Sequence, residues 1–404
     1  MRILPQAKKD GNMRTQEIND RTTERKFIDL PRALYRNDPH WICPLDNDIA
    51  AVFNPSRNSF FRHGQCTRWI LLDDRGHTIG RIAAFINSEK AYRNSRPTGG
   101  IGFFECIDDK TAAHCLFDTA RSWLQDRDMQ AMDGPINFGE NDKYWGLLVE
   151  GFKAPSLGMN YNPSYYIRLL ESYGFAPLYD QLTNFLDATR PLPERFTRIS
   201  DWVMKKPGYS FSHFSIRRKE KFFSDFADIY NDGWSGFENF TPLKPDTIRE
   251  SFRQMQAVMD EKIIWFAYHE GEPAAFVLCL PDVNQILKHI KGRLDLPGRL
   301  KFFWYRHTSR VDRIRITVMG CKKKFQRHGL ESALIRCLQE EVLPRKTIKG
   351  VELAWVGDFN KKMLALHEAT GAKKEKVHRT YRYVFNTSAL SLSPYPPSPS
   401  SDRT

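Results

Sequence analysis

The sequence predicts an α/β (α+β) protein made of two similar halves, each with a mixed, mostly antiparallel sheet flanked by helices. Its length of 404 residues is too great for one ordinary domain and suits two. A hairpin pattern, in which a strand, a tight turn with glycine and a second apolar strand follow each other, occurs at residues 69–86 and again at 265–280. A pattern that occurs twice in the same form favours a repeated domain.

A second repeated feature follows each hairpin. Gly174 and Gly371 each end a helical segment, at the position where a helix favours glycine. Strand-like residues come after both, at 181–186 and 380–385. The two glycines are separated by nearly the same number of residues as the two hairpins, which supports the repeat. The alternative is two unrelated hairpins and two ordinary helix ends.

The remaining elements follow from periodicity and from helix start and stop signals. In the first half we expect a central strand at 100–106 and a helix at 110–125. In the second half we expect the helices 219–230, 245–259, 329–342 and 361–369 and the strands 313–319 and 351–356. The predicted organisation is a flexible polar tail (1–25), a first domain (26–190), a Pro-containing linker (191–207), a second domain (208–386) and a disordered Ser/Pro tail (387–404).

Composition narrows the function classes. The 61 Lys and Arg against 48 Asp and Glu give a net charge of +13, which suits nucleic acid, an acidic membrane surface or phosphate-rich small molecules. Aromatic residues at 13% exclude a wholly disordered chain. The polar N-terminus, the absence of a long apolar run and of any CxxC pair, and histidines without i+3 or i+4 partners predict a cytoplasmic protein with no membrane span, disulfide framework or metal.

The most informative segment joins the strand 313–319 to the helix 329–342 through a basic loop. Gln326-Arg-His-Gly329 opens the helix, where backbone N–H groups and the helix dipole favour an anion. Gly329 lets the backbone come close to a ligand. Lys322, Lys323, Lys324 and Arg327 add positive charge. The segment therefore suits a diphosphate, and the alternative is a solvated basic loop that caps a structural helix.

This turn resembles the signature of the GNAT superfamily of acyl-CoA-dependent N-acyltransferases. Gln326 to Gly329 match its first four positions, whereas Glu331 replaces a small residue and would repel a diphosphate. The segment 360–372 resembles a later element of the superfamily, with His367 in place of its Tyr. The resemblance implies acetyl-CoA or another acyl-CoA as co-substrate and no metal. The residues that it implies for cofactor binding are Val318, Gly320, Lys322, Lys323, Lys324, Gln326, Arg327, His328, Gly329, Leu330 and Asn360.

The first half resembles a degenerate GNAT domain. The strand 100–106 enters its helix without the Gln/Arg-x-x-Gly turn, and Asp108 and Asp109 would repel a diphosphate. The segments 102–105, 134–138, 146–152 and 160–162 are similar to those of a bacterial double-GNAT family. The resemblance therefore implies two tandem GNAT-like domains, with the acyl-CoA site in the second.

Direct acyl transfer needs a base for the amine and an acid for the leaving thiolate. Glu352 lies in the strand 351–356 and is the candidate base, with a structural salt-bridge partner as the alternative. His367 is the candidate acid, with an exposed histidine stabilised by the helix dipole as the alternative. We expect the two to flank the same cleft.

Polar and aromatic residues on a loop suggest where the acceptor binds. Asn137, Asp142 and Trp145 lie in the segment 134–146, and Trp234 ends a helix in the second half. A structural loop and core aromatics are the alternative. The predicted function is an N-acyltransferase that moves an acyl group, expected to be acetyl, from coenzyme A to a small-molecule or peptide amine. The alternative is an inactive GNAT-like module with a basic face for nucleic acid or another polyanion, to which residues 217–221 would contribute.

Overall fold

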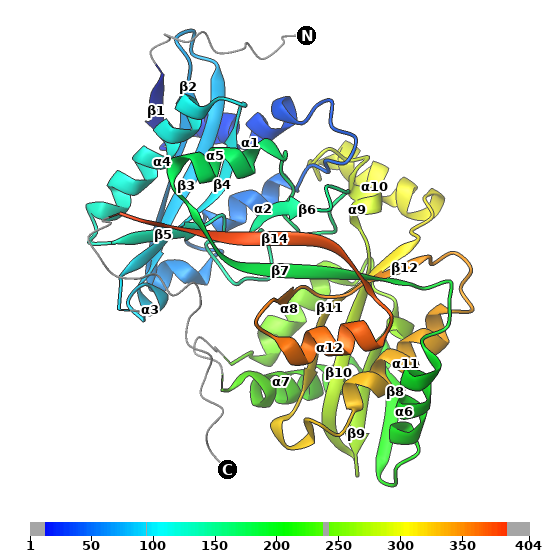
Figure 1. Ribbon diagram of the computed structural model, residues 1–404. Helices are drawn as coiled ribbons and strands as arrows, with labels where there is room; N and C mark the ends of the chain where they lie inside the picture. The colour runs from blue at the N-terminus through cyan, green and yellow to red at the C-terminus, as the bar shows by residue number, and fades with distance from the viewer. Residues whose placement is uncertain (1–12, 94, 237–241, 386–404) are drawn as a thin grey trace. The chain divides into compact units, whose positions relative to one another are not determined.

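The computed structural model describes residues 13–93, 95–236 and 242–385 and divides the chain into two compact units (Figure 1). Unit 1 contains the chain up to Gln181, the segment Leu287–Trp304 and the chain from Lys376. Unit 2 contains Leu182–Ile286 and Tyr305–Glu375. The predicted Ser/Pro tail and residues 1–12 of the predicted N-terminal tail lie outside the described residues.

Unit 1 is a sheet with helices on both faces. Its elements are β1 (Arg14–Glu17), α1 (Arg21–Leu34), α2 (Asp46–Val52), η1 (Ser59–Arg62), β2 (Gly64–Leu72), β3 (Thr78–Asn87), α3 (Ser88–Ala91), β4 (Thr98–Cys106), α4 (Lys110–Gln125), β5 (Ala131–Gly134), β6 (Leu147–Glu150) and α5 (Tyr165–Tyr173). Four elements cross the boundary between the units: β7 (Ala176–Asp187), α9 (Asn284–Leu287), α10 (Leu296–Thr308) and β14 (Lys373–Val384).

Unit 2 repeats the same kind of architecture. Its elements are α6 (Glu194–Met204), β8 (Tyr209–His213), η2 (Ile216–Arg218), α7 (Lys219–Trp234), α8 (Pro245–Met255), η3 (Glu261–Ile263), β9 (Ile264–His269), β10 (Glu272–Pro281), β11 (Arg313–Cys321), η4 (Lys323–Phe325), α11 (Leu330–Val342), β12 (Gly350–Glu352), β13 (Val356–Gly357) and α12 (Lys361–Ala369). No helix of the described residues is long and apolar enough to cross a bilayer.

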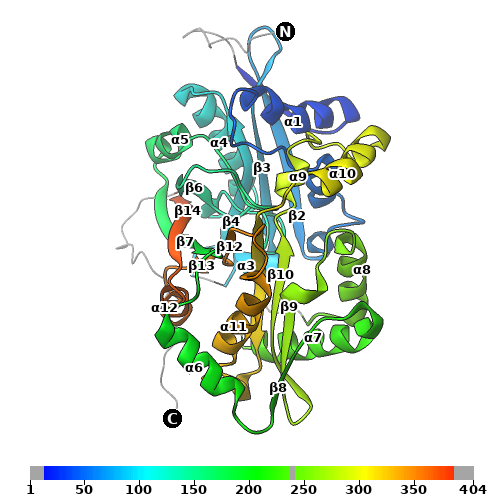
Figure 2. The same cartoon turned by 90° about the vertical axis from the view of Figure 1, so that its right-hand side faces the viewer.

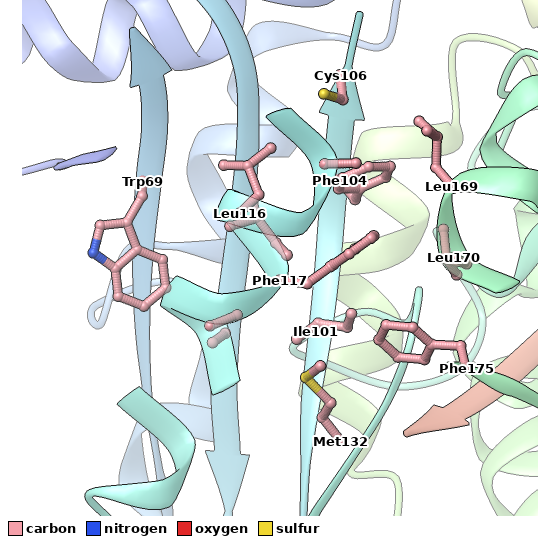
Figure 3. Close-up of a cluster of buried hydrophobic side chains, with 14 of the residues drawn as sticks. Trp69, Ile101, Phe104, Cys106, Leu116, Phe117, Met132, Leu169, Leu170 and Phe175 are labelled. Carbon is pink, nitrogen blue, oxygen red and sulfur yellow. The ribbon is translucent and has the colours of Figure 1, made fainter. Parts of the chain in front are cut away.

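Side-chain alternation along the strands gives unit 1 two cores. On one face of the sheet, Trp69 and Ile101 pack with Leu116 and Phe117 of α4 and Leu170 of α5 (Figure 3). On the other face, the neighbouring strand residues Ile70 and Leu72 pack with Phe27 of α1 and Ile49 of α2. Both helix layers are amphipathic and bury their apolar side on the sheet.

The two units share one strand order, which confirms the predicted repeat. In unit 1 the order is β1-β2-β3-β4-β5, with β4 and β5 parallel and the other neighbours antiparallel. In unit 2 the order is β8-β9-β10-β11-β12, with β11 and β12 the parallel pair. The predicted hairpins, β2–β3 and β9–β10, occupy equivalent places. The predicted α/β class with mostly antiparallel sheets is therefore confirmed.

The last strand of each half completes the sheet of the other unit. Residues Leu182–Asp187 of β7 lie in unit 2 and pair with β12, so that Val351 lies opposite Leu186. Residues of β14 from Lys376 lie in unit 1 and pair with β5, so that Tyr383 lies opposite Met132. Both strands exist where the sequence predicts them, but they are exchanged. Equivalent strand edges accept either strand, because the backbone hydrogen bonds are the same.

Three further segments differ from the sequence-based expectation. The predicted linker contains α6, whose Phe196, Ser200 and Val203 lie buried on one helical face. Pro193 precedes this helix, a place where proline is tolerated. The predicted polar tail contains β1 and the start of α1, which Asp20 caps by accepting a hydrogen bond from the N–H of Thr23. The predicted strand 351–356 is split into β12 and β13.

Candidate functional site

The turn between β11 and α11 in unit 2 presents an uncapped helix N-terminus. Gly329 is the N-cap residue of α11, with φ of +83°, and it offers no side chain to the first N–H groups of the helix. Arg327, two residues earlier, also has a positive φ of 70°. In unit 1 the equivalent helix α4 is capped by Asp109, whose carboxylate accepts from the N–H of Ala112 at 2.8 Å. The helix N-terminus that could bind an anion thus has a side-chain cap in unit 1 and none from its N-cap residue in unit 2.

Strands β11 and β12 pair over a short stretch and then separate. The parallel pairing joins Arg313–Arg315 to Gly350–Glu352. Beyond it, β11 continues to Cys321, whereas the chain after β12 turns to β7, where the N–H of Leu353 donates to the carbonyl oxygen of Asn184 at 2.9 Å. The β11 strand therefore reaches the turn alone on this side.

The predicted basic side chains of the turn fall into two groups. Lys322 is buried, and its Nζ lies 2.6 Å from Oδ2 of Asp228 and 3.0 Å from Oε1 of Glu272. Lys324 contacts the other oxygen of Glu272 at 2.6 Å. The structure thus engages these two lysines with acidic residues. The side chains of Lys323, Gln326 and Arg327 are exposed. A diphosphate at this turn would therefore meet Lys323 and Arg327 rather than three lysines.

Three other predicted cofactor residues have contacts within the fold of unit 2. Leu330 is fully buried in the core under α11. His328 is exposed, and its Nδ1 lies 2.6 Å from the hydroxyl of Tyr209. Asn360 caps α12, where its Oδ1 accepts from the N–H of Met363 at 3.2 Å.

Glu331 lies in the first turn of α11, beside the uncapped amides. Burial raises the pKa of its carboxyl. When ionised, the carboxylate places a negative charge at this helix end, where it would repel a bound anion.

Gly320 and Trp234 lie together on the opposite face of the unit 2 sheet, where α7 packs. A Cβ on Gly320 would lie 2.5 Å from Cζ3 of Trp234. The Trp234 ring stacks on Tyr230 with a centroid separation of 4.5 Å, and Val318 packs in the same cluster. Trp234 is therefore a packing partner of β11, which matches the core alternative.

Glu352 is fully buried and takes part in a charged cluster of unit 2. Its Oε1 lies 3.3 Å from Nε of Arg315. Next to it, Arg313 binds Asp282 through both Nε and an Nη nitrogen, at 3.0 and 2.8 Å. A buried carboxylate needs such a partner, because the charged form is costly to desolvate. The contact agrees with the structural salt-bridge alternative.

His367 is also buried, so the alternative of an exposed helix histidine is wrong. The side-chain amide of Asn184 lies 3.0 Å from its Nδ1, which places the proton of the neutral ring on Nε2 when the amide donates. Burial lowers the pKa of His367 to about 4. The ring is therefore neutral near pH 7, and it can donate a hydrogen bond but holds no additional proton to release.

Glu352 and His367 lie on opposite faces of the sheet. Glu352 is paired with Phe185 on β7, and directly opposed residues of an antiparallel pair share a face. Asn184 is the next residue along β7, so its side chain and the bound His367 lie on the other face, with α11. The expectation that the two flank one cleft is wrong, because strand alternation separates them.

Unit 1 holds a cavity of about 60 Å³ beside a buried ionic cluster. Its lining includes Glu105, which accepts hydrogen bonds from Tyr35 at 2.6 Å and Tyr166 at 2.9 Å. Arg81 lies 3.4 Å from the other oxygen of Glu105 and donates to the carbonyl oxygen of Phe27 at 2.6 Å. Burial raises the pKa of Glu105 and lowers that of Arg81.

The loop that we expected to hold the acceptor contributes to this cavity through other residues. Pro135 and Tyr144 line it, whereas Asn137, Asp142 and Trp145 are not among the lining residues. Trp145 is fully buried, with its ring 5.9 Å from that of His378, and the Oδ1 of Asn137 is buried without a hydrogen bond among the described residues.

Sequence reasoning missed Arg81 and Glu105. Both interrupt otherwise apolar strands, Ile79–Ile86 and Gly100–Cys106. A charged residue in a buried strand is the signal that singled out Glu352, and it applied equally to this pair. Within the described residues, no group of His, Cys, Asp and Glu could hold a metal ion. All seven cysteines lie in the described chain and are free thiols.

Comparison with solved structures identifies the class of fold. A tandem GNAT protein from the clavulanic acid biosynthesis pathway matches with a TM-score of 0.52 and 12% identity, over 94% of this chain and all of that one. A glucosamine N-acetyltransferase region of a fungal β-N-acetylglucosaminidase matches with a TM-score of 0.52 and 10% identity, over 94% of this chain and 39% of that one. The two units form a tandem GNAT fold.

Sequence comparison identifies the family. The bacterial ceramide synthase of Caulobacter vibrioides is 30% identical over 365 residues, which cover 88% of this chain and 94% of that protein. The protein YghO of Escherichia coli is 28% identical over 364 residues, or 88% of this chain and 91% of that protein. No family model matches the chain. The chain belongs to the family of the bacterial ceramide synthase.

Proposed function

We propose that the protein is an N-acyltransferase that transfers an acyl group from a coenzyme A thioester to an amine. The observation that carries this proposal is the turn at Gly329, whose left-handed conformation opens α11 without a capping side chain. A helix end of this kind binds phosphate through its N–H groups. The tandem GNAT fold and the family likeness support the same class of reaction.

The residues at the turn fit the diphosphate of coenzyme A in two respects and oppose it in one. The free N–H groups of α11 and the exposed Lys323 and Arg327 would hold the phosphates. The Glu331 carboxylate lies in the first turn of the same helix and repels phosphate when it is ionised, so we expect it to weaken binding. Bound acyl-CoA supplies an activated thioester.

In the proposed reaction, the amine nitrogen forms a bond to the thioester carbonyl carbon and the bond to sulfur breaks. The amine loses one proton and the thiolate gains one. Because Glu352 and His367 lie on opposite sheet faces, we assign the amine proton to solvent or to a group of the substrate. The two side chains then have structural roles: Glu352 pairs with Arg315, and His367 contacts Asn184.

The acceptor proposed for this chain is the amine of a long-chain amino alcohol. The relative named ceramide synthase supports it, since a ceramide is the N-acyl derivative of such a compound. The same chemistry favours a long acyl chain over the acetyl group that the sequence led us to expect. The polyanion-binding alternative is not favoured, because one cation of its basic segment is already paired: Lys221 contacts Asp225 at 2.5 Å.

The test combines binding and product analysis. Calorimetric titration with acetyl-CoA and with a long-chain acyl-CoA measures the donor preference. Mass spectrometry after incubation with a long-chain 2-amino-1,3-diol or a polyamine identifies the acylated amine. We expect tighter binding of the long-chain donor and an amide of the aminodiol. If the protein binds no acyl-CoA thioester and releases no thiol with any amine, the proposal is overturned. Acylation of the polyamine alone would overturn only the lipid acceptor.

A further inference from the structure

Helix α10 presents its apolar side chains outward. Leu296, Leu300, Phe303 and Trp304 have exposed fractions between 53% and 73%. Their spacing of four, seven and eight residues places them on one face of the helix. The inward positions are different: Gly298 is buried, and Phe302 and Tyr305 are half-buried. A surface helix normally has the reverse arrangement, so this face needs an explanation.

Basic side chains border the apolar face on both sides. At 3.6 residues per turn, Arg299 and Arg306 fall on one flank of the face and Lys301 falls on the other. All three are exposed. The segment before the helix adds exposed Lys288 and Lys291. An apolar stripe flanked by Lys and Arg is typical of helices that lie in the interface of an anionic membrane.

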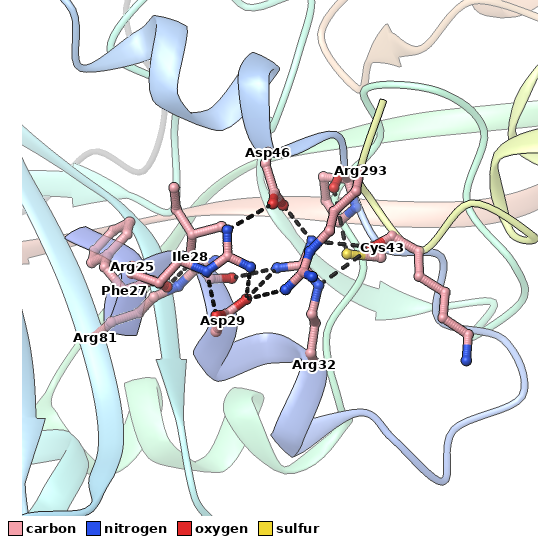
Figure 4. Close-up of polar contacts among 11 residues, drawn as sticks. Arg25, Phe27, Ile28, Asp29, Arg32, Cys43, Asp46, Arg81 and Arg293 are labelled. Atoms are coloured by element: carbon pink, nitrogen blue, oxygen red, sulfur yellow. Dashed lines mark hydrogen bonds and ion pairs between the residues drawn. The ribbon is translucent and has the colours of Figure 1, made fainter. Parts of the chain in front are cut away.

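The start of this segment is fixed to α1 and α2 (Figure 4). The guanidinium of Arg32 donates to the carbonyl oxygen of Lys291 at 3.1 and 3.3 Å. The N–H of Asp46 donates to the carbonyl oxygen of Gly292 at 2.8 Å. Gly292 has a φ of +82°, and a Cβ there would lie 2.6 Å from the carbonyl oxygen of Pro44. These contacts lie within unit 1 and hold the chain that leads into α10 (yellow in Figure 2).

We propose that α10 docks the protein on the surface of an anionic lipid bilayer. Leucine and aromatic side chains of the outward face enter the boundary between headgroups and acyl chains, and the flanking Arg and Lys contact lipid phosphates. This is a surface contact rather than a span. The inference goes beyond the proposed function, because it rests on α10 and not on the turn at Gly329.

The experiment is flotation of the full chain with vesicles at about 0.1 M salt. Vesicles of phosphatidylcholine alone are compared with vesicles that also contain phosphatidylglycerol. The test variant is Leu300→Ser/Trp304→Ser, and the matched control is Ile199→Ser/Trp202→Ser, which removes an exposed aliphatic and an exposed Trp from α6. A third variant, Arg299→Gln/Lys301→Gln, removes two flanking charges.

We expect the unaltered chain and the α6 control to float with the anionic vesicles. The apolar variant should lose at least about tenfold in partitioning, and each charge removed should cost about fivefold on anionic vesicles only. Acyl-CoA binding without vesicles should be equal in all variants, which separates this inference from the proposed function. No flotation of the unaltered chain, or equal flotation of the α10 and α6 variants, would overturn it. So would self-association that the α10 variant alone abolishes, without vesicle binding, because a second copy would then be the occupant.

Discussion

Replacement of Gly329 by alanine is expected to weaken acyl-CoA binding in addition to destabilising the fold. The residue has a φ of +83°, where an L-residue with a Cβ is strained. Relief of that strain would move the backbone out of the left-handed region and rotate the two peptide planes beside it. The N–H groups at the start of α11 would then no longer converge on one anion. We therefore expect at least a tenfold rise in the dissociation constant, about 1.4 kcal/mol.

Gly271 provides a matched control for the strain. It has the same φ of +83°, in the turn between β9 and β10, and an added Cβ would meet nothing within 4 Å. Each alanine should therefore lower the free energy of unfolding by about 1–2 kcal/mol. At Gly329 the Cβ would also lie 2.9 Å from Cγ2 of Val203, a side chain that must shift. The loss of stability should thus be equal to or larger than that at Gly271.

Two measurements distinguish the effects. Urea unfolding gives the stability of both variants, and calorimetric titration with acyl-CoA gives their affinity. The expected result is comparable destabilisation with a binding defect at Gly329 alone. If Gly329→Ala binds acyl-CoA as the unaltered chain does, the helix end is not the diphosphate site. Equal loss of binding in both variants would show that the effect comes from stability.

Three further outcomes concern Glu331, Glu352 and His367. Glu331→Gln should tighten acyl-CoA binding about fivefold, from ~1 kcal/mol of removed repulsion at the helix end; calorimetry over a pH series should also show that the pH dependence due to this carboxyl disappears. Glu352→Gln should lower the free energy of unfolding by about 3–5 kcal/mol, because Arg315 loses its buried partner; unchanged stability with a roughly hundredfold lower turnover would instead make Glu352 the base. His367 has a folded pKa of about 4, below the ordinary 6.5, so the folded state binds fewer protons and stability should fall as the pH drops from about 6.5 to 4. The loss should approach ~3 kcal/mol in urea unfolding, and His367→Gln should remove most of this pH dependence.

The sequence predicts the elements of the fold well because their signals are local. The helices at 110–125 and 361–369 have the predicted bounds, as α4 and α12. Hairpin turns and the glycines after α5 and α12 also depend on a few neighbouring residues. The exchange of β7 and β14 has no local signal, since either strand offers the same hydrogen-bonding groups to the edges of β5 and β12. Domain boundaries predicted from the order of elements along the chain therefore could not account for the exchange of these two strands.

In the candidate site, too, the features with local signals were predictable and those that depend on distant contacts were not. The turn at Gly329 was predictable, because glycine at a strand-to-helix junction has a defined conformational reason. The partners of Lys322 were not, since Asp228 and Glu272 come from α7 and β10 and meet it only in the fold. Glu352 and His367 could not be placed relative to each other, because their sheet faces depend on the register with a strand from the first half. Arg81 and Glu105, like Glu352, are charged residues in otherwise apolar strands, so the same reasoning could have identified them.

The two units differ in how the N-terminus of the helix after the central strand is capped, and this difference supports the proposal that unit 2 binds the donor. Each has a helix that starts directly after the central strand, with N–H groups that need acceptors. In unit 1, Asp109 supplies the acceptor from within the chain, so the helix end is satisfied and repels anions. In unit 2, Gly329 supplies none. With glycine at the N-cap, the missing side-chain acceptor costs about a few tenths of a kcal/mol, and a bound anion would provide the acceptor instead. Added acyl-CoA should therefore raise the free energy of unfolding through this helix end, and Gly329→Ala, which disturbs the same end, should reduce that gain.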